Sequence, residues 1–558
     1  DALLRAQQRA LSEAKAGEGD IVLSAARLTP FPPPREMLIS TNCASEGLAR
    51  IQERDLREGE VHVGRCLEVT TISDPSVSCG MVSVVAEDGS GNALRLVIHY
   101  FTSERTLAGV ARLLPKGSQV LVREPFFQDF PIGGSAVCCA NPDNLEIHVP
   151  GGTSEAQDFE ALMSSSQFSA ALQLVESSSG ASGRADGKHL QARALEALGR
   201  YKDAARILFG LQTAESIQKA GAMMKRAREQ ESGDFDFLAL HRADASAPTR
   251  FPCASYFNPR VAVMGTEDRG KGVFAREALS VGELVMGSKA ECIIFNSDLS
   301  GKRLRRVPGW DEDGEDSTAD TLLMQSLAEG VLMSTERRER LLGLSCGEGE
   351  AVPGQGDAAL LRLLHVVKTN RFTANQPWDG GVAGTGLWLE PSRLNHACDA
   401  NCSWCNIGDM MFVRCQRTVA IGEELTIPYC NPTDSRESRR EFLNNRHGFL
   451  CNCKLCQMQS DGQFGACSYE RDVDMAEACE AQCKPDYVKA LGHRSSAFEF
   501  LASSQLYCSQ RQAQTEHAMH ANAACHKLGR QREAQSWLVA AKEAFALQWG
   551  SQPGVFNL

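Results

Sequence analysis

The sequence lacks any long apolar segment, because no run approaches the roughly 18 residues needed to cross a bilayer. No secretory signal peptide is visible either. Basic residues are in deficit, since 58 Lys and Arg stand against 70 Asp and Glu, for a net charge of -12. A general nucleic-acid binder would normally show a basic field. We therefore expect no membrane partner and no direct nucleic-acid binding, whereas a basic protein substrate is compatible with the charge.

The pattern of a secreted disulfide scaffold is also missing. The chain has 558 residues and 21 cysteines, an odd number, and eleven of them lie between Cys398 and Cys483. Disulfide scaffolds are typically short and carry even numbers of cysteines. Clustered cysteines in a long chain instead indicate reduced, metal-binding thiols. We expect an intracellular protein of the cytoplasm, the nucleus or both, and no compact basic run selects between them.

The densest cysteine cluster is the C-x-C-x2-C formed by Cys451, Cys453 and Cys456. Three cysteines are one ligand short of a tetrahedral sulfur site for zinc. Cys398, earlier in the chain, is the expected fourth ligand. A structural zinc ion typically contributes about 10–16 kcal/mol of apparent binding energy. The sequence therefore predicts a zinc-pinned lid over 445–457 that folds against the segment around Cys398.

Other cysteines compete with this interpretation by their spacing. Two of them follow Cys398 closely, and we interpret them as thiols of a strand or loop: Cys402 and Cys405. Three more offer an irregularly spaced second site: Cys467, Cys479 and Cys483.

The length predicts roughly three to four domains, so the expected fold is multidomain α+β. We expect a partly disordered leader over 1–60. Residues 61–150 contain short β-rich runs at 61–63, 81–85, 94–101, 119–122 and 145–149. Five strands at this spacing predict a small β-barrel, OB-like in form, that binds a ligand or simply packs against a partner.

Residues 155–245 change to helical periodicity. The segments 167–172 and 200–205 are alike and 33 residues apart, each with an aromatic residue three positions before an alanine. This period resembles the tetratricopeptide repeat, and a generic helical hairpin is the alternative. Residues 528–534 repeat part of the pattern inside a second helical region, expected over 470–550. Such helices are candidate surfaces for protein partners.

Residues 250–432 are mixed in character. Strands are expected at 261–264, 283–286 and 291–295, and a buried helix at 360–367. Between them, residues 296–357 are charged and glycine-rich, which indicates an insertion.

Four motifs follow one another in this part of the chain: the glycine turn Arg269-Gly270-Lys271-Gly272, then Asn395-His396-Ala397-Cys398, then Glu423-Glu424-Leu425-Thr426-Ile427-Pro428-Tyr429, and then Gly448-Phe449 before the cysteines. The glycine turn alone would be a weak signal, but the ordered set is specific. It resembles the SET-domain protein lysine methyltransferases. The insertion, the cysteine-rich lid and the helical repeats resemble the SET-and-MYND branch. The resemblance is strong over 250–457 and weak over 470–550.

The resemblance implies small β-sheets around a threaded crossing at Asn395-His396, with S-adenosylmethionine on one face and a substrate lysine entering from the other. Arg269, Lys271 and Gly272 would meet the methionine end of this cofactor. The resemblance therefore implies a protein-lysine N-methyltransferase.

Four further positions are implied on the cofactor side. Asn370 would face the cofactor, Asn395 and His396 would bind it through amide and backbone groups, and Phe449 would cover the adenine. Outside the family motif, His396 and Phe449 would be interpreted as structural residues.

Tyr429 is the expected catalytic residue. A sulfonium carries a strongly electrophilic methyl group, so the enzyme must mainly align amine, methyl and sulfur, and such positioning lowers a barrier by up to about 7–11 kcal/mol. The Tyr429 hydroxyl would orient the lysine nitrogen beside the cofactor. A core tyrosine at the end of a strand is the alternative.

The chain departs from the family pattern in two places. The insertion carries only Cys346 and no C-x2-C pairs, so the zinc-binding MYND module is missing. Pro428 and Cys430 flank Tyr429 where other residues are more usual, and a proline removes one N–H donor there. A non-catalytic scaffold, in which the helices and barrel bind protein partners, is therefore the alternative function.

Overall fold

The computed structural model describes residues 48–550, except for 79–80, 100–109, 112, 131–133, 140–143, 149–158, 161, 164–167, 178–184, 245–248, 267–268, 300–317, 334, 347–356, 376–381, 461–466 and 483. Most of the expected leader, together with Cys483, lies outside the described residues. The chain forms two compact units. The N-terminal unit comprises 1–224, 299–343 and 351–364, and the C-terminal unit comprises 225–298, 344–350 and 365–558. No described helix combines the length and the apolar character needed to span a bilayer.

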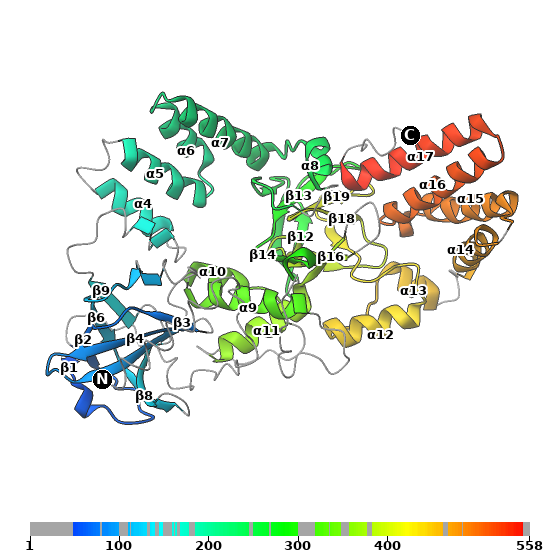
Figure 1. Ribbon diagram of the computed structural model, residues 1–558. Coiled ribbons are helices and arrows are strands. Elements are labelled where there is room, and N and C mark those ends of the chain that lie inside the picture. The colour runs from blue at the N-terminus through cyan, green and yellow to red at the C-terminus, as the bar shows by residue number, and fades with distance from the viewer. Residues whose placement is uncertain are drawn as a thin grey trace. The chain divides into compact units, whose positions relative to one another are not determined.

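The N-terminal unit is built on a nine-stranded sheet in the order β7-β8-β5-β4-β2-β6-β9, with β1 beside β2 and β3 beside β4 (Figure 1). Its strands are β1 (Ala49–Arg50), β2 (Arg65–Thr71), β3 (Ser76–Ser78), β4 (Met81–Asp88), β5 (Ala93–His99), β6 (Gln119–Arg123), β7 (Phe126–Phe130), β8 (Gly134–Cys139) and β9 (Leu145–His148). Most pairs are antiparallel, whereas β5 with β8 and β1 with β2 are parallel. Alternate residues such as Val84, Leu96 and Val120 are fully buried and form the core.

The predicted strands are recovered in part. The runs at 81–85, 94–101, 119–122 and 145–149 overlap β4, β5, β6 and β9. The predicted strand at 61–63 is wrong, because among these residues only Val61 makes an isolated bridge, to Phe126. Strands β1, β2, β3, β7 and β8 were not predicted. The OB-like barrel stays a prediction.

Helices complete the N-terminal unit: α4 (Phe168–Ser177), α5 (Ala185–Ala197), α6 (Tyr201–Phe209), α9 (Thr318–Met333) and α10 (Thr335–Leu342), with α7 (Ala214–Ser232) and α11 (Asp357–Asn370) crossing into the second unit. Phe168 and Tyr201 begin α4 and α6, and the alanines three positions later, Ala171 and Ala204, are fully buried. Small residues at these positions let successive helices approach closely, as a repeat requires. The tetratricopeptide assignment stays a prediction.

The C-terminal unit contains three small sheets, ordered β10-β13-β19-β18, β11-β12-β20-β17 and β14-β16-β15. Their strands are β10 (Tyr256–Phe257), β11 (Val261–Gly265), β12 (Lys271–Ala275), β13 (Leu284–Lys289), β14 (Cys292–Phe295), β15 (Phe372–Asn375), β16 (Val382–Leu387), β17 (Asn395–His396), β18 (Cys402–Ile407), β19 (Met410–Cys415) and β20 (Glu424–Ile427). The predicted strands at 261–264, 283–286 and 291–295 are confirmed as β11, β13 and β14. The predicted helix at 360–367 lies within α11, where Leu363, Val366 and Val367 are fully buried.

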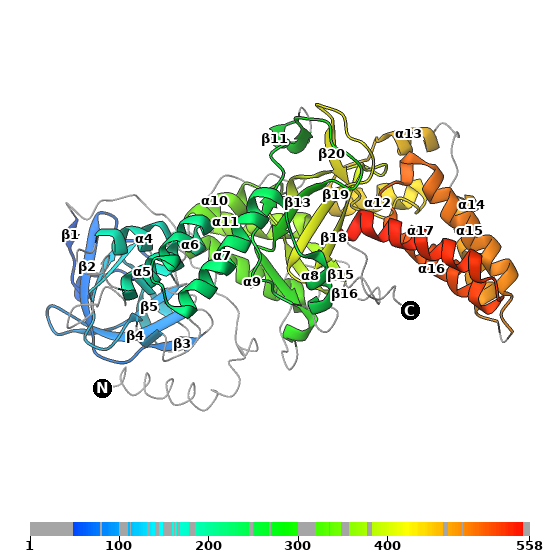
Figure 2. The same ribbon diagram turned by 90° about the horizontal axis from the view of Figure 1, so that it is seen from above.

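Helices cover the sheets of this unit: α8 (Phe237–Asp244), α12 (Arg436–His447), α13 (Lys454–Ser460), α14 (Cys467–Glu480), α15 (Tyr487–Ser503), α16 (Arg511–Lys527) and α17 (Gln531–Trp549). Four of them, α14 to α17, pack in sequence order, as the orange and red ribbons show in Figure 2. Helix α17 lies against β18 and β19, where Phe545 and Trp549 share a core with Phe412. The Gln548 amide donates to the Trp404 carbonyl at 3.2 Å. The last helices therefore brace the strands that lead to the site.

Candidate active site

Two segments far apart in the sequence meet where β17 runs parallel to β20, with Asn395 opposite Thr426 and His396 opposite Ile427. The backbone N–H of Tyr429, just beyond β20, donates to His396 Nδ1 at 3.0 Å. Because that ring nitrogen accepts, the neutral imidazole carries its proton on Nε2. Nε2 lies 3.3 Å from the Cys398 sulfur and donates to it. Burial lowers the pKa of His396 to about 4, which keeps the ring neutral.

Tyr429 is held firmly at the end of this crossing. Its hydroxyl donates to the Leu394 carbonyl at 2.6 Å, and its ring centroid lies 5.3 Å from that of His396. Burial raises the pKa of Tyr429 above its usual range. The side chain is therefore a neutral phenol that can orient a ligand but cannot act as a base near neutral pH.

The glycine turn lies beside the same crossing, because β20 also pairs with β12. The Asn395 amide donates to Glu424 Oε1 at 2.7 Å and to the Lys271 carbonyl at 3.2 Å. Arg269 forms an ion pair of 2.6 Å with Glu424 Oε2. A Cβ at Gly272 would lie 2.5 Å from Glu424 Oε1 and 3.0 Å from Asn395 Nδ2, so a side chain here would displace both groups. The structure thus brings four of the predicted cofactor-binding residues together around Glu424, namely Arg269, Lys271, Gly272 and Asn395.

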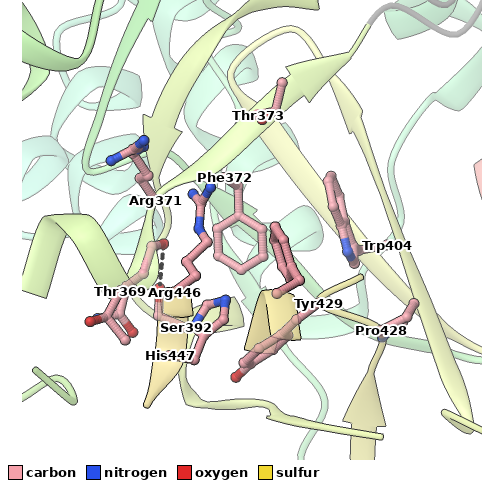
Figure 3. Close-up of a pocket in the computed structure, with 12 residues that line it drawn as sticks. Thr369, Arg371, Phe372, Thr373, Ser392, Trp404, Pro428, Tyr429, Arg446 and His447 are labelled. Atoms are coloured by element: carbon pink, nitrogen blue, oxygen red, sulfur yellow. Dashed lines mark hydrogen bonds between the residues drawn. The ribbon is translucent and has the colours of Figure 1, made fainter. Parts of the chain in front are cut away.

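Asn370 is used differently from the other predicted cofactor residues. Its side-chain amide donates to the Val366 and Ser345 carbonyls, both at 2.7 Å, and thereby satisfies the end of α11. The amide is directed into the protein, although the residue itself lines the adjoining pocket. The Ser392 hydroxyl lies 3.5 Å from the Asn370 carbonyl, the contact dashed in Figure 3. The side-chain amide of Asn370 is therefore already hydrogen-bonded, and only its backbone groups remain to contact a ligand in the pocket.

A pocket of about 240 Å³ opens beside Tyr429. Within the described part of the chain, its walls combine aromatic rings, two arginines and hydroxyls without a carboxylate. They comprise Thr369, Asn370, Arg371, Phe372, Thr373, Ser392, Trp404, Pro428, Tyr429, Phe442, Arg446 and His447. Figure 3 shows the His447 ring beside Tyr429, with Phe372 and Trp404 on the other side of the pocket. The Phe372 and Trp404 rings meet edge to face at 5.4 Å. Such walls suit a ligand that is partly apolar and partly charged.

Sequence reasoning identified only two of these lining residues, Asn370 and Tyr429. It missed Glu424, which joins Asn395 to the glycine turn, although Glu424 stands inside the motif that pointed to Tyr429. It also missed Ser392 and His447. Ser392 lies three residues before Asn395, and His447 lies two residues before Phe449, so nearness to the motifs was the available signal.

The four predicted zinc ligands converge. The sulfurs of Cys398, Cys451, Cys453 and Cys456 all lie within 4.8 Å of one another. The Cys398 sulfur is 3.9 Å from that of Cys451 and 3.6 Å from that of Cys456. A tetrahedral zinc site with bonds of about 2.3 Å requires sulfurs about 3.8 Å apart, whereas a disulfide would require about 2 Å. The donor set therefore fits a zinc ion.

Other thiols do not form a comparable set. His396, Cys398 and Cys430 also lie within reach of one another, but they supply only three ligands and share Cys398 with the larger group. Cys402 and Cys405 lie in β18 and are buried, as strand thiols should be. Among the described residues, Cys467 and Cys479 belong to no such group.

A buried arginine supports the thiol cluster. Arg439 on α12 is 1% exposed. Its Nε donates to the Cys398 sulfur at 3.2 Å and its Nη2 to the Cys456 sulfur at 3.7 Å. The same side chain donates to the Pro432 carbonyl at 3.1 Å and to Gln459 Oε1 at 2.6 Å. Four thiolates around one Zn²⁺ carry a net charge of -2, which a buried guanidinium partly neutralises.

Phe449 lies between the two parts of the site. Its ring centroid is 5.9 Å from that of His396 and 6.2 Å from that of His447, and it packs in the core that contains Cys398. This position is compatible with the predicted contact to adenine, and the contact itself stays a prediction.

With this geometry established, comparison with known proteins defines the class. A family model described as "SET domain" matches residues 270–430. That range contains the glycine turn from Gly270 onward, Asn395-His396 and Tyr429. The chain therefore carries a SET domain.

Two relatives carry names that specify the chemistry of this family further. A Gibberella zeae protein named "Methyltransferase" is 23% identical over 521 residues, covering 76% of this chain and 69% of its own length. Human "Histone-lysine N-methyltransferase SMYD3" is 42% identical over 92 residues, which are 16% of this chain and 19% of SMYD3. The chain is thus homologous to SMYD3 and other SET methyltransferases, and its match spans about a fifth of the SMYD3 sequence.

The solved SET domain of LSMT, bound to lysine and AdoHcy, aligns with 57% of this chain and 90% of its own. The sequence identity is 10% and the TM-score is 0.20, too low to support a structural comparison.

Proposed function

We propose that this chain is an S-adenosylmethionine-dependent protein-lysine N-methyltransferase. The observation that supports it most is the meeting of β17 and β20 inside a SET domain. That meeting places Tyr429 at a pocket beside the cradle formed by Gly272, Asn395 and Glu424. The polar groups gathered here, the Asn395 side chain, the Glu424 carboxylate and the backbone of the glycine turn, would meet the polar methionine end of the cofactor.

The proposed reaction needs alignment rather than a protein nucleophile. The lone pair of the lysine nitrogen attacks the cofactor methyl group, a C–N bond forms, and the S–C bond breaks with its electron pair left on sulfur. Tyr429 is neutral, and its hydroxyl is tied to the Leu394 carbonyl, so its ring and oxygen present a fixed wall to the reacting atoms. The aromatic faces of Phe372 and Trp404 would hold a cationic ligand through cation–π contact, worth about 0.5–2 kcal/mol.

A zinc ion bound by Cys398, Cys451, Cys453 and Cys456 would have a structural role. It would join the segment after β17 to the start of α13. In this way it would hold residues 445–457, which include Phe449, as a lid. Four protein ligands leave no open coordination position, so this site supplies order rather than Lewis acidity.

The accessory regions are proposed to select the substrate. The helical segments over 155–245 and 470–550 would bind protein partners or a protein substrate, histone or otherwise, and the N-terminal sheet would act as an OB-like module. The clustered thiols support an intracellular site of action, in the cytoplasm, the nucleus or both, where cysteines stay reduced.

Two measurements test the methyltransferase proposal. Calorimetric titration with S-adenosylmethionine should give a saturable heat with one site per chain. Tritiated S-adenosylmethionine and a whole-cell lysate should then show protein labelling that falls by about 100-fold or more in Tyr429→Phe. Tyr469→Phe is the matched control, because it removes a buried hydroxyl that bonds to His517 on the C-terminal helices. Absence of cofactor binding would favour the scaffold alternative, and equal labelling by Tyr429→Phe would remove Tyr429 from the mechanism.

A further inference from the structure

The His447 side chain lines the pocket beside Tyr429. His447 is the last residue of α12, and the next residue, Gly448, ends the helix in the left-handed conformation at φ 73°. The helix is capped at its other end by Ser435, whose side chain accepts from the Ser438 N–H. With both ends fixed, the His447 ring is set against the pocket. Its centroid lies 4.8 Å from that of Tyr429 and 6.2 Å from that of Phe449.

The Nδ1 atom of His447 is buried, and within the described part of the chain it has no hydrogen-bond partner. A buried polar atom normally has a partner, because leaving it unpaired costs free energy. His447 lines the adjacent pocket, so a ligand that enters there can become this partner once it displaces the atoms that now cover Nδ1. The unpaired nitrogen therefore indicates a ligand atom, and the ring can supply either a lone pair or an N–H to it.

The charges around this ring favour its neutral form. Burial, followed by the nearby charge of Arg446, lowers the pKa of His447 to about 4. Arg371 adds a second cation to the pocket wall, while His396 and Tyr429, which also face the ring, are neutral. The carboxyl end of α12 acts in the opposite direction, since it favours a cation. A neutral imidazole has one nitrogen free to accept a proton.

The proposed reaction needs such an acceptor. A substrate lysine arrives as an ammonium ion near neutral pH, since its ordinary pKa is about 10.4, and it cannot attack until it has lost a proton. None of the described residues of the pocket wall carries a carboxylate. The Tyr429 hydroxyl already donates to Leu394, and His396 Nδ1 already accepts from the Tyr429 N–H. Among the described residues of the pocket wall, the remaining basic atom is on His447.

We propose that His447 is a catalytic residue that accepts the proton of the substrate ammonium before methyl transfer. The inference rests on the proposed function. The N–H bond of the ammonium breaks as Nδ1 takes the proton, which gives a neutral amine and an imidazolium. The amine then attacks the sulfonium methyl group, and the methylated product carries the positive charge while the sulfur becomes a neutral thioether. The imidazolium returns its proton to water, which reaches the partly exposed ring.

The test compares His447→Phe with wild type in the labelling assay, with initial rates measured between about pH 6 and 10. The wild-type rate should level off near neutral pH. The variant should be slower by about 100-fold near neutral pH. Its rate should then rise about tenfold per pH unit, as the free amine fraction grows. Added imidazole should restore about tenfold of the rate in His447→Gly, a rescue that a purely structural role would not allow.

His526→Phe is the matched control, because His526 stands in the last turn of α16 and is exposed. Calorimetry with S-adenosylmethionine shows whether each variant keeps its folded pocket. A His447→Phe rate within about threefold of wild type, with a parallel pH profile, overturns the role of His447 and leaves the methyltransferase proposal intact. A wild type that binds no cofactor, or labels nothing, overturns both.

Discussion

The thiol cluster and the pocket are neighbours that are built in opposite ways. The cluster takes three of its four ligands from residues 451–456, and all four are one atom type held within 4.8 Å. The pocket draws its walls from six separate places in the chain, at 369–373, 392, 404, 428–429, 442 and 446–447. A metal ion imposes one geometry on identical donors, so the spacing of the ligand residues in the sequence can reveal its site. A pocket is a property of the packed fold.

The two regions should therefore fail differently. Loss of the cluster removes a large, local source of order, whereas a change in the pocket should alter ligand binding with little cost to stability. They are joined at His396, which accepts from the Tyr429 N–H on one side and donates to Cys398 on the other. Damage to the cluster should consequently reach the pocket, while damage to the pocket should leave the cluster intact.

The largest effect is expected from Cys398→Ser, which removes the ligand that joins the cluster to β17. Structural zinc typically supplies about 10–16 kcal/mol, so loss of one ligand should release the ion and open α12 and α13. Elemental analysis should show zinc falling from one equivalent to near zero, with loss of hydrogen-exchange protection over 436–460. Cys292→Ser, in β14, is the control that keeps its zinc. Full zinc content in Cys398→Ser would mean that the four thiols are not the ligand set.

Arg439→Met should have the next largest effect. It removes a buried cation that donates to the sulfurs of Cys398 and Cys456 and leaves those groups without their partner. Breaking such buried charge pairing costs about 3–5 kcal/mol. Zinc should pass to a competing chelator faster, and the unfolding free energy should fall. Arg440→Met, one position along the same helix and less buried, should change both far less, because Arg440 contacts the Cys451 carbonyl at 3.5 Å rather than a sulfur. Equal behaviour of the two variants would remove the special role of Arg439.

Gly272→Ala should separate the pocket from the cluster. The added Cβ would lie 2.5 Å from Glu424 Oε1 and would push apart the contact between Glu424 and Asn395. Such overpacking costs about 1–3 kcal/mol. Cofactor affinity should fall by about tenfold or more while zinc content stays at one equivalent. Gly265→Ala in β11 is the control, since a Cβ there meets nothing within 4 Å. Unchanged cofactor affinity in Gly272→Ala would place the cofactor elsewhere.

The contrast also explains what the sequence could predict about the site. The four cysteines were identified from spacing and chemistry alone, because zinc accepts few other arrangements. Asn395 and Tyr429 came from an ordered motif. Arg439 and His447 carry no such signal: an arginine in a run of charged helix residues gives no sign of burial, and His447 acquires its meaning only when α12 ends beside Tyr429.

For the secondary structure too, local patterns could be predicted and tertiary pairings could not. Strands β11, β13 and β14 and helix α11 could be predicted because their apolar periodicity is local. Strands β7 and β8 were missed, since Gln128 and Asp129 interrupt the apolar pattern of β7 and β8 begins with Gly134 and Ser135. The predicted strand at 61–63 reduces to one bridge, because pairing with Phe126 is a tertiary event that no local pattern encodes.

The smallest effect is expected from Ser392→Ala at the pocket wall. The Ser392 hydroxyl donates to the Trp388 carbonyl at 2.7 Å, but the Ser392 backbone N–H also donates to that carbonyl at 3.1 Å. Removing the hydroxyl therefore leaves no unpaired group there, and the cost should be about 0.5–1.5 kcal/mol with zinc content unchanged. Ser495→Ala is the control, because its hydroxyl donates to the Leu491 carbonyl four residues earlier, as in Ser392 and Trp388. If calorimetry shows Ser392→Ala losing as much cofactor affinity as Gly272→Ala, the hydroxyl itself contacts the cofactor, and the pocket depends on single polar atoms as strictly as the cluster depends on its sulfurs.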